Sequence, residues 1–101
     1  MRLVWVLGER TQGCADRATI ARRVVARLGR EVFSESAPRS VEGVVQHEGD
    51  RWDAHLYVRD GDGSLFGSRY LSSTAPDCSA LDAAVTLAIA LAIDPDAVAR
   101  P

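Results

Sequence analysis

Residues 77–95, DCSALDAAVTLAIALAIDP, contain the longest apolar run of the chain and decide its fold. Between residues 80 and 93 every side chain is Ala, Leu, Val or Ile except Asp82 and Thr86. A helix of this composition is apolar almost all the way round, so it has to be buried on several sides. The run is shorter than the roughly 18 to 20 apolar residues of a membrane span, and runs of about 10 to 14 residues are more often core helices. We therefore expect a central buried helix in one small domain.

The ends of this helix are marked by residues that favour helix boundaries. Ser79 is expected to be the N-cap, its hydroxyl accepting from the free amides of the first turn, and Asp82 is expected to return a bond three residues later. Pro95 disfavours helical geometry in the residue before it, so the helix is expected to end at Ile93 or Asp94.

Length and charge limit the class of protein. The chain has 101 residues, the size of one domain. Its formal net charge is -2. A nucleic-acid-binding surface usually needs a clear excess of basic residues, so nucleic acid is not expected as the main partner. We expect a single α+β domain over residues 1–95, followed by a tail or the start of a linker over residues 96–101.

The chain has two cysteines, Cys14 and Cys78, and each comes just before an expected helix. Two helices packed side by side on one sheet bring their first turns close together, so this matching placement favours a disulfide. Such a bridge would contribute roughly 3 to 5 kcal/mol on the chain-entropy model and would indicate an oxidising compartment. Two buried thiols are the main alternative. A redox or metal role has less support, because there is no CxxC motif and no nearby histidine.

The start of the chain lacks the features of a secretion signal. Residues 3–7, LVWVL, are apolar, but residues 8–10, GER, interrupt the run, which is too short for the apolar region of a signal peptide. We prefer an exported protein whose signal has been removed, with a cytoplasmic protein as the alternative. Residues 97–101 have the composition of the start of a linker, which agrees with this interpretation.

The remaining elements follow from the spacing of apolar residues. Residues 3–7 are β-branched and aromatic and predict a strand buried on both faces, which we expect in the middle of the sheet. Over residues 17–28 apolar side chains recur at helical spacing and predict a helix that ends at Gly29. Two alternating runs flank residues 48–51, EGDR, and a third follows residues 60–63, DGDG, so they predict three strands joined by two hairpins.

The order strand, helix, three strands and helix (β-α-β-β-β-α) predicts an α+β two-layer sandwich with a four-stranded sheet and two helices on one face. If Gly49 and Asp50 form a two-residue turn, one face of the first hairpin packs on the helices and the other stays open. In the last strand Leu65 and Leu71 are expected to face the helices. The inward-facing residues of the first hairpin are then Val41, Gly43 and Val45, paired with Val58, Leu56 and Ala54.

No group of residues has the spacing of a catalytic or metal site. The segment at residues 60–63 resembles the start of a calcium loop, but the closing glutamate is missing, so a hairpin turn is expected. His47 and His55 are expected on opposite faces of the hairpin and so cannot share a metal ion. No serine or cysteine has an activating partner, and no glycine-rich loop joins a strand to a helix. We therefore expect a protein that is not an enzyme and has no cofactor or metal.

The uncovered face of the sheet is the best candidate for a functional surface. Aromatic and apolar side chains on a sheet without a second covering layer are typical of protein contact sites, although cross-strand pairing that only stabilises the hairpins is an equal alternative. The edges of the sheet also allow a partner or a second copy to add a strand. The candidate partner-binding residues are Val44, His55, Tyr57, Phe66 and Tyr70.

The order of several short motifs resembles a family of exported proteins. An uncharacterised N-terminal domain of envelope proteins from myxobacteria-like bacteria has a Cys near its first helix, an LG at the end of that helix, an APR segment, a DxDG hairpin, a GxRxLSS strand, a second Cys and an AIALAIDP helix. The resemblance covers nearly the whole chain and implies export and the disulfide, but it transfers no catalytic residue. The matching positions are Cys14, residues 28–29, 37–39, 60–63 and 67–73, Cys78 and residues 88–95.

These patterns together predict a non-catalytic, disulfide-stabilised domain of the periplasm or cell envelope. It is expected to bind a protein partner, or to self-associate, through the open sheet face or an edge strand. One alternative is a small ligand-binding or enzyme-accessory domain with a cleft between the segment around Arg39 and the second hairpin. That function would need a deep pocket with convergent polar groups. The other alternative is a self-assembling structural module.

Overall fold

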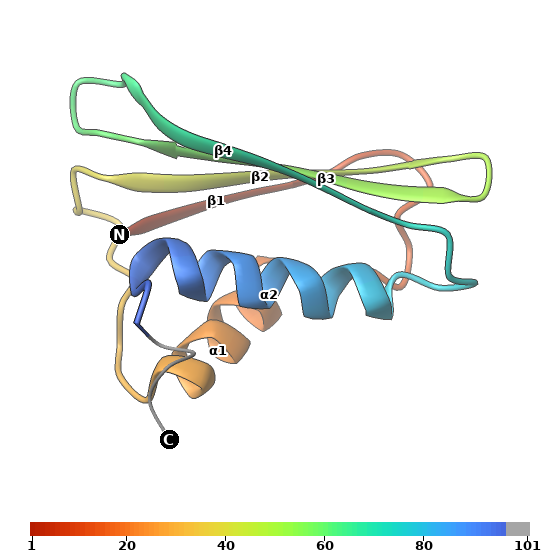
Figure 1. Ribbon diagram of the computed structural model, residues 1–101, viewed down its shortest axis with the longest axis horizontal. Coiled ribbons are helices and arrows are strands. Elements are labelled where there is room, and N and C mark those ends of the chain that lie inside the picture. The colour runs from red at the N-terminus through yellow and green to blue at the C-terminus, as the bar shows by residue number, and fades with distance from the viewer. Residues whose placement is uncertain (97–101) are drawn as a thin grey trace.

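The computed structural model of the protein describes residues 1–96. The elements in chain order are β1 (Arg2–Leu7), α1 (Arg17–Leu28), β2 (Ser40–Glu48), β3 (Arg51–Arg59), β4 (Leu65–Ser73) and α2 (Ser79–Ile93). The four strands form one sheet and both helices cover the same face of it, so the predicted α+β two-layer sandwich is confirmed (Figure 1). The tail or linker predicted at residues 96–101 lies, apart from Asp96, outside the described residues.

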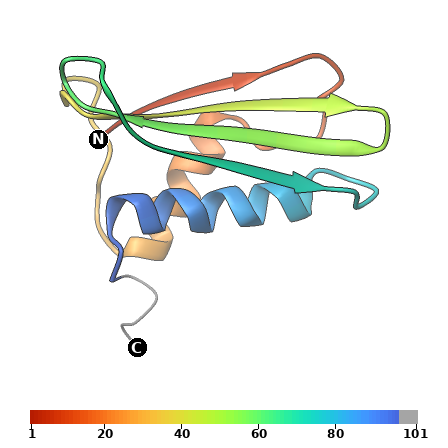
Figure 2. The ribbon, with the colours of Figure 1, turned by 45° about the horizontal axis from the view of Figure 1, so that its top comes forward.

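β1 lies at an edge of the sheet, so its predicted central position is wrong. The strand order is β1-β2-β3-β4, and β1 pairs in parallel with β2 alone (Figure 2). α1 makes the long crossover that parallel neighbours need, whereas β3 and β4 follow β2 through tight hairpins and extend the sheet away from β1. Leu3 is buried while Val6 is 46% exposed, so the uniformly apolar run conceals an alternation of covered and open positions.

The β2–β3 hairpin has the predicted register. Gly49 and Asp50 form its turn, because Glu48 pairs with Arg51. Gly49 has a φ of 61°, which glycine adopts without steric cost. The predicted inward pairs are all present, namely Val41 with Val58, Gly43 with Leu56 and Val45 with Ala54.

Gly43 gives the Trp5 indole room against β2. A Cβ built on Gly43 would lie 2.1 Å from Cζ3 of Trp5, a distance that no packing tolerates. The Trp5 Nε1 donates to the carbonyl oxygen of Ala15, 3.1 Å away, in the segment that leads into α1. Trp5 therefore links β1 and β2 to the start of α1.

The β3–β4 hairpin departs from regular pairing. Val58 pairs with Gly67 and Arg59 pairs with Leu65, so Phe66 is an extra residue in a β-bulge. A bulge places two residues of one strand opposite one residue of its partner and so shifts the alternation of side chains. Leu65 therefore lies opposite Arg59 on the open face and is 54% exposed, so its predicted inward position is wrong.

The two helices bury their larger side chains against the sheet. Asp16 is the N-cap of α1, and its carboxylate accepts from the Thr19 amide at 2.8 Å. The helix is followed by Gly29 in the left-handed conformation, as predicted. α2 ends at Ile93, which also agrees with the sequence. The core between the layers consists mainly of Leu3, Ile20, Val24, Val41, Val45, Ala54, Leu56, Leu81, Val85 and Ile89, with Leu71 packed against it as predicted.

α2 is less completely covered than its composition suggests. Its outer side carries small residues, and Ala80, Ala83, Ala84 and Ala92 are exposed there. Because alanine presents little apolar area to water, exposing it costs less free energy than exposing leucine would. The outer surface of α2 therefore consists largely of short side chains.

Candidate binding surface

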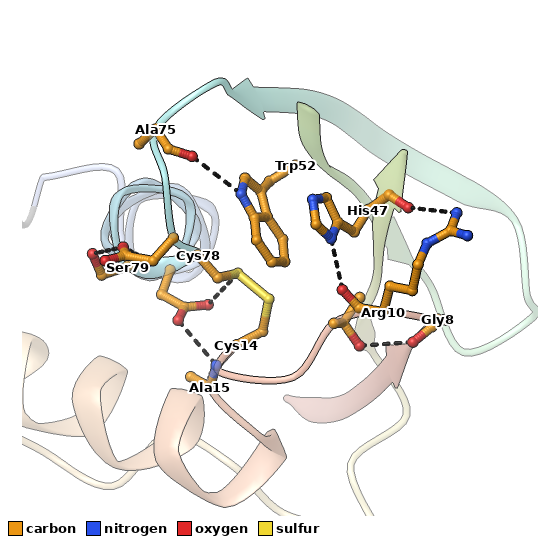
Figure 3. Close-up of a disulfide and its surroundings, with 12 residues drawn as sticks. Gly8, Arg10, Cys14, Ala15, His47, Trp52, Ala75, Cys78 and Ser79 are labelled. Carbon is orange, nitrogen blue, oxygen red and sulfur yellow. Dashed lines mark hydrogen bonds between the residues drawn. A yellow bond between two sulfur atoms is a disulfide. The ribbon is translucent and has the colours of Figure 1, made fainter. Parts of the chain in front are cut away.

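The predicted disulfide between Cys14 and Cys78 is present and joins the N-terminal ends of the two helices (Figure 3). The two Cα atoms are 5.1 Å apart, and the bridge links residues separated by 64 positions in the chain. Cys78 is 1% exposed, while Cys14 is half-buried. The domain is therefore stabilised by a disulfide, a bond typical of proteins in oxidising compartments.

Asp82 connects the segment before α1 to α2 at this corner. Its Oδ2 accepts a hydrogen bond from the backbone amide of Ala15 at 2.9 Å. Its Oδ1 lies 3.7 Å from Sγ of Cys78, which carries no hydrogen in the disulfide and therefore donates none. Removal from water raises the pKa of the Asp82 carboxyl above its usual value. Among residues 1–96, the Ala15 amide is thus the one N–H or O–H group that donates to this carboxyl group, which lies against the bridge.

The cap of α2 differs from the sequence prediction. Cys78 and not Ser79 is the N-cap residue, and Asp82 turns toward Ala15 instead of capping its own helix. Asp77 takes over part of the capping, because its Oδ1 accepts from the amide of Ser79 at 3.0 Å. Since the disulfide holds Cys78 at the start of the helix, the cap lies one residue earlier than predicted.

Cys14, Cys78 and Asp82 form the one cluster of potential ligand atoms within residues 1–96, all lying within 4.8 Å of one another. Metal ions bind thiolates, and a disulfide sulfur is not one. In the oxidised bridge the cluster is therefore a disulfide beside a carboxyl group.

Trp52 and His47 pack beside the bridge on the helix-covered side (Figure 3). Their rings stack with centroids 3.6 Å apart, and the Trp52 Nε1 donates to the carbonyl oxygen of Ala75 at 3.2 Å. Trp52 and His55 are three positions apart along β3, so their side chains project to opposite faces of the sheet. His47 pairs with Trp52, and His47 and His55 are therefore on opposite faces, as predicted.

A row of side chains crosses the open face of the sheet. Cross-strand pairing places Val6 beside Val44, Val44 opposite His55, and His55 opposite Tyr70. The rings of His55 and Tyr70 are 4.8 Å apart and tilted by 53°, an arrangement that aromatic rings favour. Three of the five candidate residues are thus brought together. Val6 was missed because its strand was expected to be covered on both faces.

Tyr57 lies on the same face in the neighbouring row. It pairs with Glu42 of β2, and the Arg59 Cζ is 5.7 Å from the centroid of its ring. The Nε of Arg59 also lies 3.8 Å from the carboxylate of Glu42. Exposed pairs of this kind contribute little to stability, but they show that the polar groups of this face contact one another.

Asp53 is the centre of a hydrogen-bonded network at one end of the open face. The Tyr70 hydroxyl donates to its Oδ1 at 2.6 Å, and the Arg51 Nε lies 3.0 Å from both carboxylate oxygens. Burial acts to raise the pKa of Asp53, but the hydrogen bonds from Tyr70 and Arg51 outweigh it and lower that pKa. The same bond to Asp53 raises the pKa of Tyr70. The Tyr70 hydroxyl therefore stabilises the sheet itself.

Phe66 lies on the helix side of the sheet, whereas the sequence placed it on the open face. Because of the bulge, it lines a pocket between β4 and α2. The residue is 65% exposed, and the Arg39 Cζ lies 4.7 Å from the centroid of its ring. Arg39 also pairs with Asp60 of the second hairpin at 3.1 Å. The Arg39 segment and the second hairpin therefore meet, next to the pocket.

The pocket between β4 and α2 has a volume of about 290 Å³. Inward-facing sheet residues form one wall, and Ala88, Ile89, Leu91 and Ala92 of α2 form the other. A Cβ built on Gly67 would have no heavy atom within 4 Å, so the space beside this glycine is open. Its principal lining residues are Leu56, Val58, Phe66, Gly67, Leu91 and Ala92.

β4 forms a free edge of the sheet (Figure 2). The pocket lies beside this strand, because Phe66, Gly67 and Arg69 of β4 line it. Within residues 1–96, no backbone hydrogen bond joins β4 to a segment other than β3. Arg69 pairs with Leu56 in the ladder, also lines the pocket, and forms no ion pair with any described residue. The one sequence signal for this site is the adjacent apolar pair Leu65 and Phe66, followed by Gly67, which breaks the alternation expected of a strand.

Comparisons of the chain with protein-family models, with curated proteins and with solved structures found no match. The resemblance to an N-terminal domain of exported proteins therefore stays a prediction. Within residues 1–96, no helix is long and apolar enough to cross a membrane.

Proposed function

We propose that the protein is a non-catalytic domain of the bacterial cell envelope that binds an extended segment of a partner protein as a fifth strand beside β4. The observation that carries this proposal is the free edge of β4 beside an apolar pocket in which Phe66 is 65% exposed. In strand addition, backbone hydrogen bonds provide affinity, and pockets for alternate side chains provide specificity. The disulfide supports the extracytoplasmic location.

The pocket has the size and lining for a side chain of the added segment. At about 290 Å³ it is at the small end of sites that bind free small molecules, and its lining lacks a set of convergent polar groups. An added strand would lie roughly 4.8 Å from β4, on its unpaired side. On α2, the pocket beside this edge is lined by Ala88, Ile89, Leu91 and Ala92.

Arg69 indicates the charge of the partner segment. Gly67 and Arg69 are two residues apart on β4 and face the same side of the sheet. If an apolar side chain of the partner segment lies beside Gly67, the partner residue two positions further along its strand lies beside Arg69. Because Arg69 has no ion pair within the described residues, we expect an acidic residue or a terminal carboxylate at that position.

A partner segment fits this edge better than a second copy of the chain does. β4 runs from Leu65 to Ser73, so a fully overlapping antiparallel pair of β4 strands would place Arg69 opposite Arg69. Like charges directly opposite each other destabilise a sheet. The bulge at Phe66 also interrupts regular pairing.

The open face supports the proposal less well than the β4 edge does. Its most exposed aromatic residue, Tyr70, donates its hydroxyl to Asp53, and Arg59 contacts both Tyr57 and Glu42. These contacts are those expected of side chains that stabilise the hairpins.

The test is a selection of random peptides against the purified, oxidised protein, followed by mapping of the bound peptide by NMR. Expected peptides are extended, with an apolar residue and an acidic residue two positions apart. The amide shifts should change along β4 and in the C-terminal half of α2. Changes confined to the open face would overturn the assignment of the site.

Two matched variants distinguish the surfaces. Gly67→Val adds a β-branched side chain where no atom lies within 4 Å, so the strand should fold and the pocket should close. We expect it to weaken peptide binding at least about tenfold, the loss of roughly one buried side chain.

The double variant Tyr57→Ser and Tyr70→Ser should bind normally. Loss of binding in the folded tyrosine variant, with normal binding by Gly67→Val, would move the site to the open face. A protein that dimerises through β4 without peptide would favour the self-assembling module.

A further inference from the structure

The carboxyl group of Asp82 is unusually placed for a bridge that acts only as a covalent link. The residue is 4% exposed, and its Oδ2 is hydrogen-bonded to the amide of Ala15. Within residues 1–96, its Oδ1 accepts from no N–H or O–H group, and it lies 3.7 Å from Sγ of Cys78, which has no hydrogen while the bridge is intact. Leaving a buried carboxyl oxygen without a donor costs free energy. A purely structural disulfide does not need such a group beside it.

Reduction of the bridge would supply the missing donor. The thiol of Cys78 would carry a hydrogen directed at a carboxyl oxygen that is already in place. Cys78 is also the N-cap of α2, a helix of 15 residues, and the positive end of a helix stabilises a thiolate. Both features favour departure of Cys78 from the bridge as the leaving sulfur.

The two sulfurs differ in access. Cys78 is 1% exposed, whereas Cys14 is half-buried in the loop before α1. A thiolate from outside therefore reaches Cys14 first. The two sulfurs therefore differ in two respects: Cys14 is the more exposed residue, and Cys78 lies beside the Asp82 carboxyl group.

We propose that the Cys14–Cys78 bridge is a thiol–disulfide exchange centre for external dithiols, in which Cys14 is the attacked sulfur and Asp82 is the proton donor and acceptor of Cys78. This inference is independent of the peptide site on β4.

The exchange balances with a dithiol as the reductant. One thiol of the reductant loses its proton to solvent and its sulfur attacks Sγ of Cys14; the bond between Cys14 and Cys78 breaks, and Cys78 leaves with the electron pair and takes the proton of the Asp82 carboxyl. The second thiol of the reductant loses its proton to solvent and attacks the reductant sulfur of the mixed disulfide. Cys14 is released as a thiolate, and solvent returns one proton to Cys14 and one to the Asp82 carboxylate. The reductant is oxidised to a disulfide and the protein gains two thiols. In the reverse direction the carboxylate removes the proton of Cys78.

The charges around Asp82 set the pH range of this step. Burial raises its pKa, the Ala15 amide and the charge of Arg23 on α1 lower it, and Asp77 before α2 raises it. The proton donor is thus present below the raised pKa and is lost as the pH increases through it. Trp52 of β3, which packs in the same core cluster as Cys78, carries no charge.

The test is the rate of reduction of the folded, oxidised protein by dithiothreitol as a function of pH, followed by alkylation and mass spectrometry. The rate should be first order in dithiothreitol. After correction for the thiolate fraction of the reductant, it should fall on the order of 10- to 100-fold as the pH increases through the Asp82 pKa, as expected for loss of a general acid. A rate independent of the reductant concentration would mean that reduction requires unfolding and would overturn the proposal. A flat corrected profile in the wild type would also overturn it, without any variant.

The variant Asp82→Asn should have a flat corrected profile. The matched control is Asp77→Asn, which removes a nearby charge from a side chain whose hydrogen bonds are to Ser79. Because Asp77 raises the pKa of Asp82, this control should keep the fall in rate and move it to lower pH. A fall that persists in folded Asp82→Asn would exclude Asp82 as the proton donor.

The attacked sulfur can be identified with a monothiol. Glutathione followed by alkylation should leave glutathione on Cys14 and the alkyl group on Cys78. Glutathione found mainly on Cys78 would contradict the assigned roles.

Discussion

The two halves of α2 contact the rest of the protein in different ways. In the N-terminal half, Cys78 is covalently bound to Cys14, Asp82 accepts from Ala15, and Leu81 is fully buried. In the C-terminal half the same helix borders an open pocket of about 290 Å³ beside the β4 edge. One end of the helix is fixed by a bond and a buried hydrogen bond, and the other end forms one wall of a groove.

The residues of α2 that stabilise the domain and those that border the proposed binding site therefore lie in different halves of the helix. A site for an added strand needs unpaired backbone and unfilled apolar space, both of which weaken a small domain locally. The bridge and the packed N-terminal half offset this by holding α2 against the sheet.

The largest effect is expected from removing the bridge. The double variant Cys14→Ala and Cys78→Ala should lose about 4 kcal/mol of unfolding free energy, because the bridge spans a sequence separation of 64. This loss is measured by urea unfolding of the double variant, with the oxidised wild-type protein as the reference. A loss below about 1 kcal/mol would show that the bridge does not hold the fixed end of α2.

The second prediction compares two leucines of the same helix. Leu81→Ala removes a side chain that is 1% exposed and should cost about 2 to 5 kcal/mol, because it leaves a cavity. Leu91→Ala removes a half-buried side chain at the pocket and should cost about 1 kcal/mol or less. Equal losses in urea unfolding would mean that both halves of α2 are packed alike.

The third prediction uses pH to compare the fixed end with the open face. The folded-state pKa of Asp82 is raised, so its contribution to stability is complete below the ordinary value of 3.8 and is lost as pH increases through the folded pKa. The free energy of unfolding of Asp82→Asn, relative to wild type, should therefore increase with pH above about 3.8.

Asp53 should behave in the opposite way and serves as the control. Its folded-state pKa is lowered, so its contribution is present above the ordinary value of 3.8 and is lost as pH falls through the folded pKa. The cost of Asp53→Asn should therefore disappear in acid. Unfolding curves of both variants from pH 3 to 8 measure this, about the range over which carboxyl groups titrate. Parallel profiles for the two variants would contradict the opposite environments.

The smallest effect on stability is expected at the groove. Gly67→Val should change the free energy of unfolding by no more than about 0.5 kcal/mol, because its side chain enters open space. Gly43→Ala is the contrasting glycine on the same face of the sheet, where Trp5 fills the space, and it should cost about 1 to 3 kcal/mol or more. Thermal unfolding of the two glycine variants measures their losses of stability. A large loss in Gly67→Val would mean that the pocket is not open.

Much of the fold was predictable because its signals are local. The spacing of apolar residues marked α1, Gly29 marked its end, and the composition around Gly49 set the register of the first hairpin. The disulfide was favoured because both cysteines precede helices that start at the same end of the sheet. Of the candidate surface, Val44, His55, Tyr57 and Tyr70 share the predicted face, since alternation with period two assigns them to it.

The predictions that were wrong concern features that depend on contacts between residues distant in sequence. Residues 3–7 of β1 are all apolar, so no local pattern distinguishes an edge strand from a central one. The position of Phe66 depends on a bulge, which is a mismatch between two strands and not a property of either. The turn of Asp82 toward Ala15 requires the disulfide to set the two helix starts side by side.

The sequence by itself therefore determined the helices, the strands and the hairpin register and favoured the pairing of Cys14 with Cys78, because each follows from periodicity or from residues near helix starts and turns. Only the tertiary structure decided which strand is at the edge, which side Phe66 faces, and which oxygen of Asp82 lacks a donor. These depend on which surfaces meet when the layers pack. The groove beside β4 and the carboxyl group beside the bridge, the two places where we propose function, both belong to this second class.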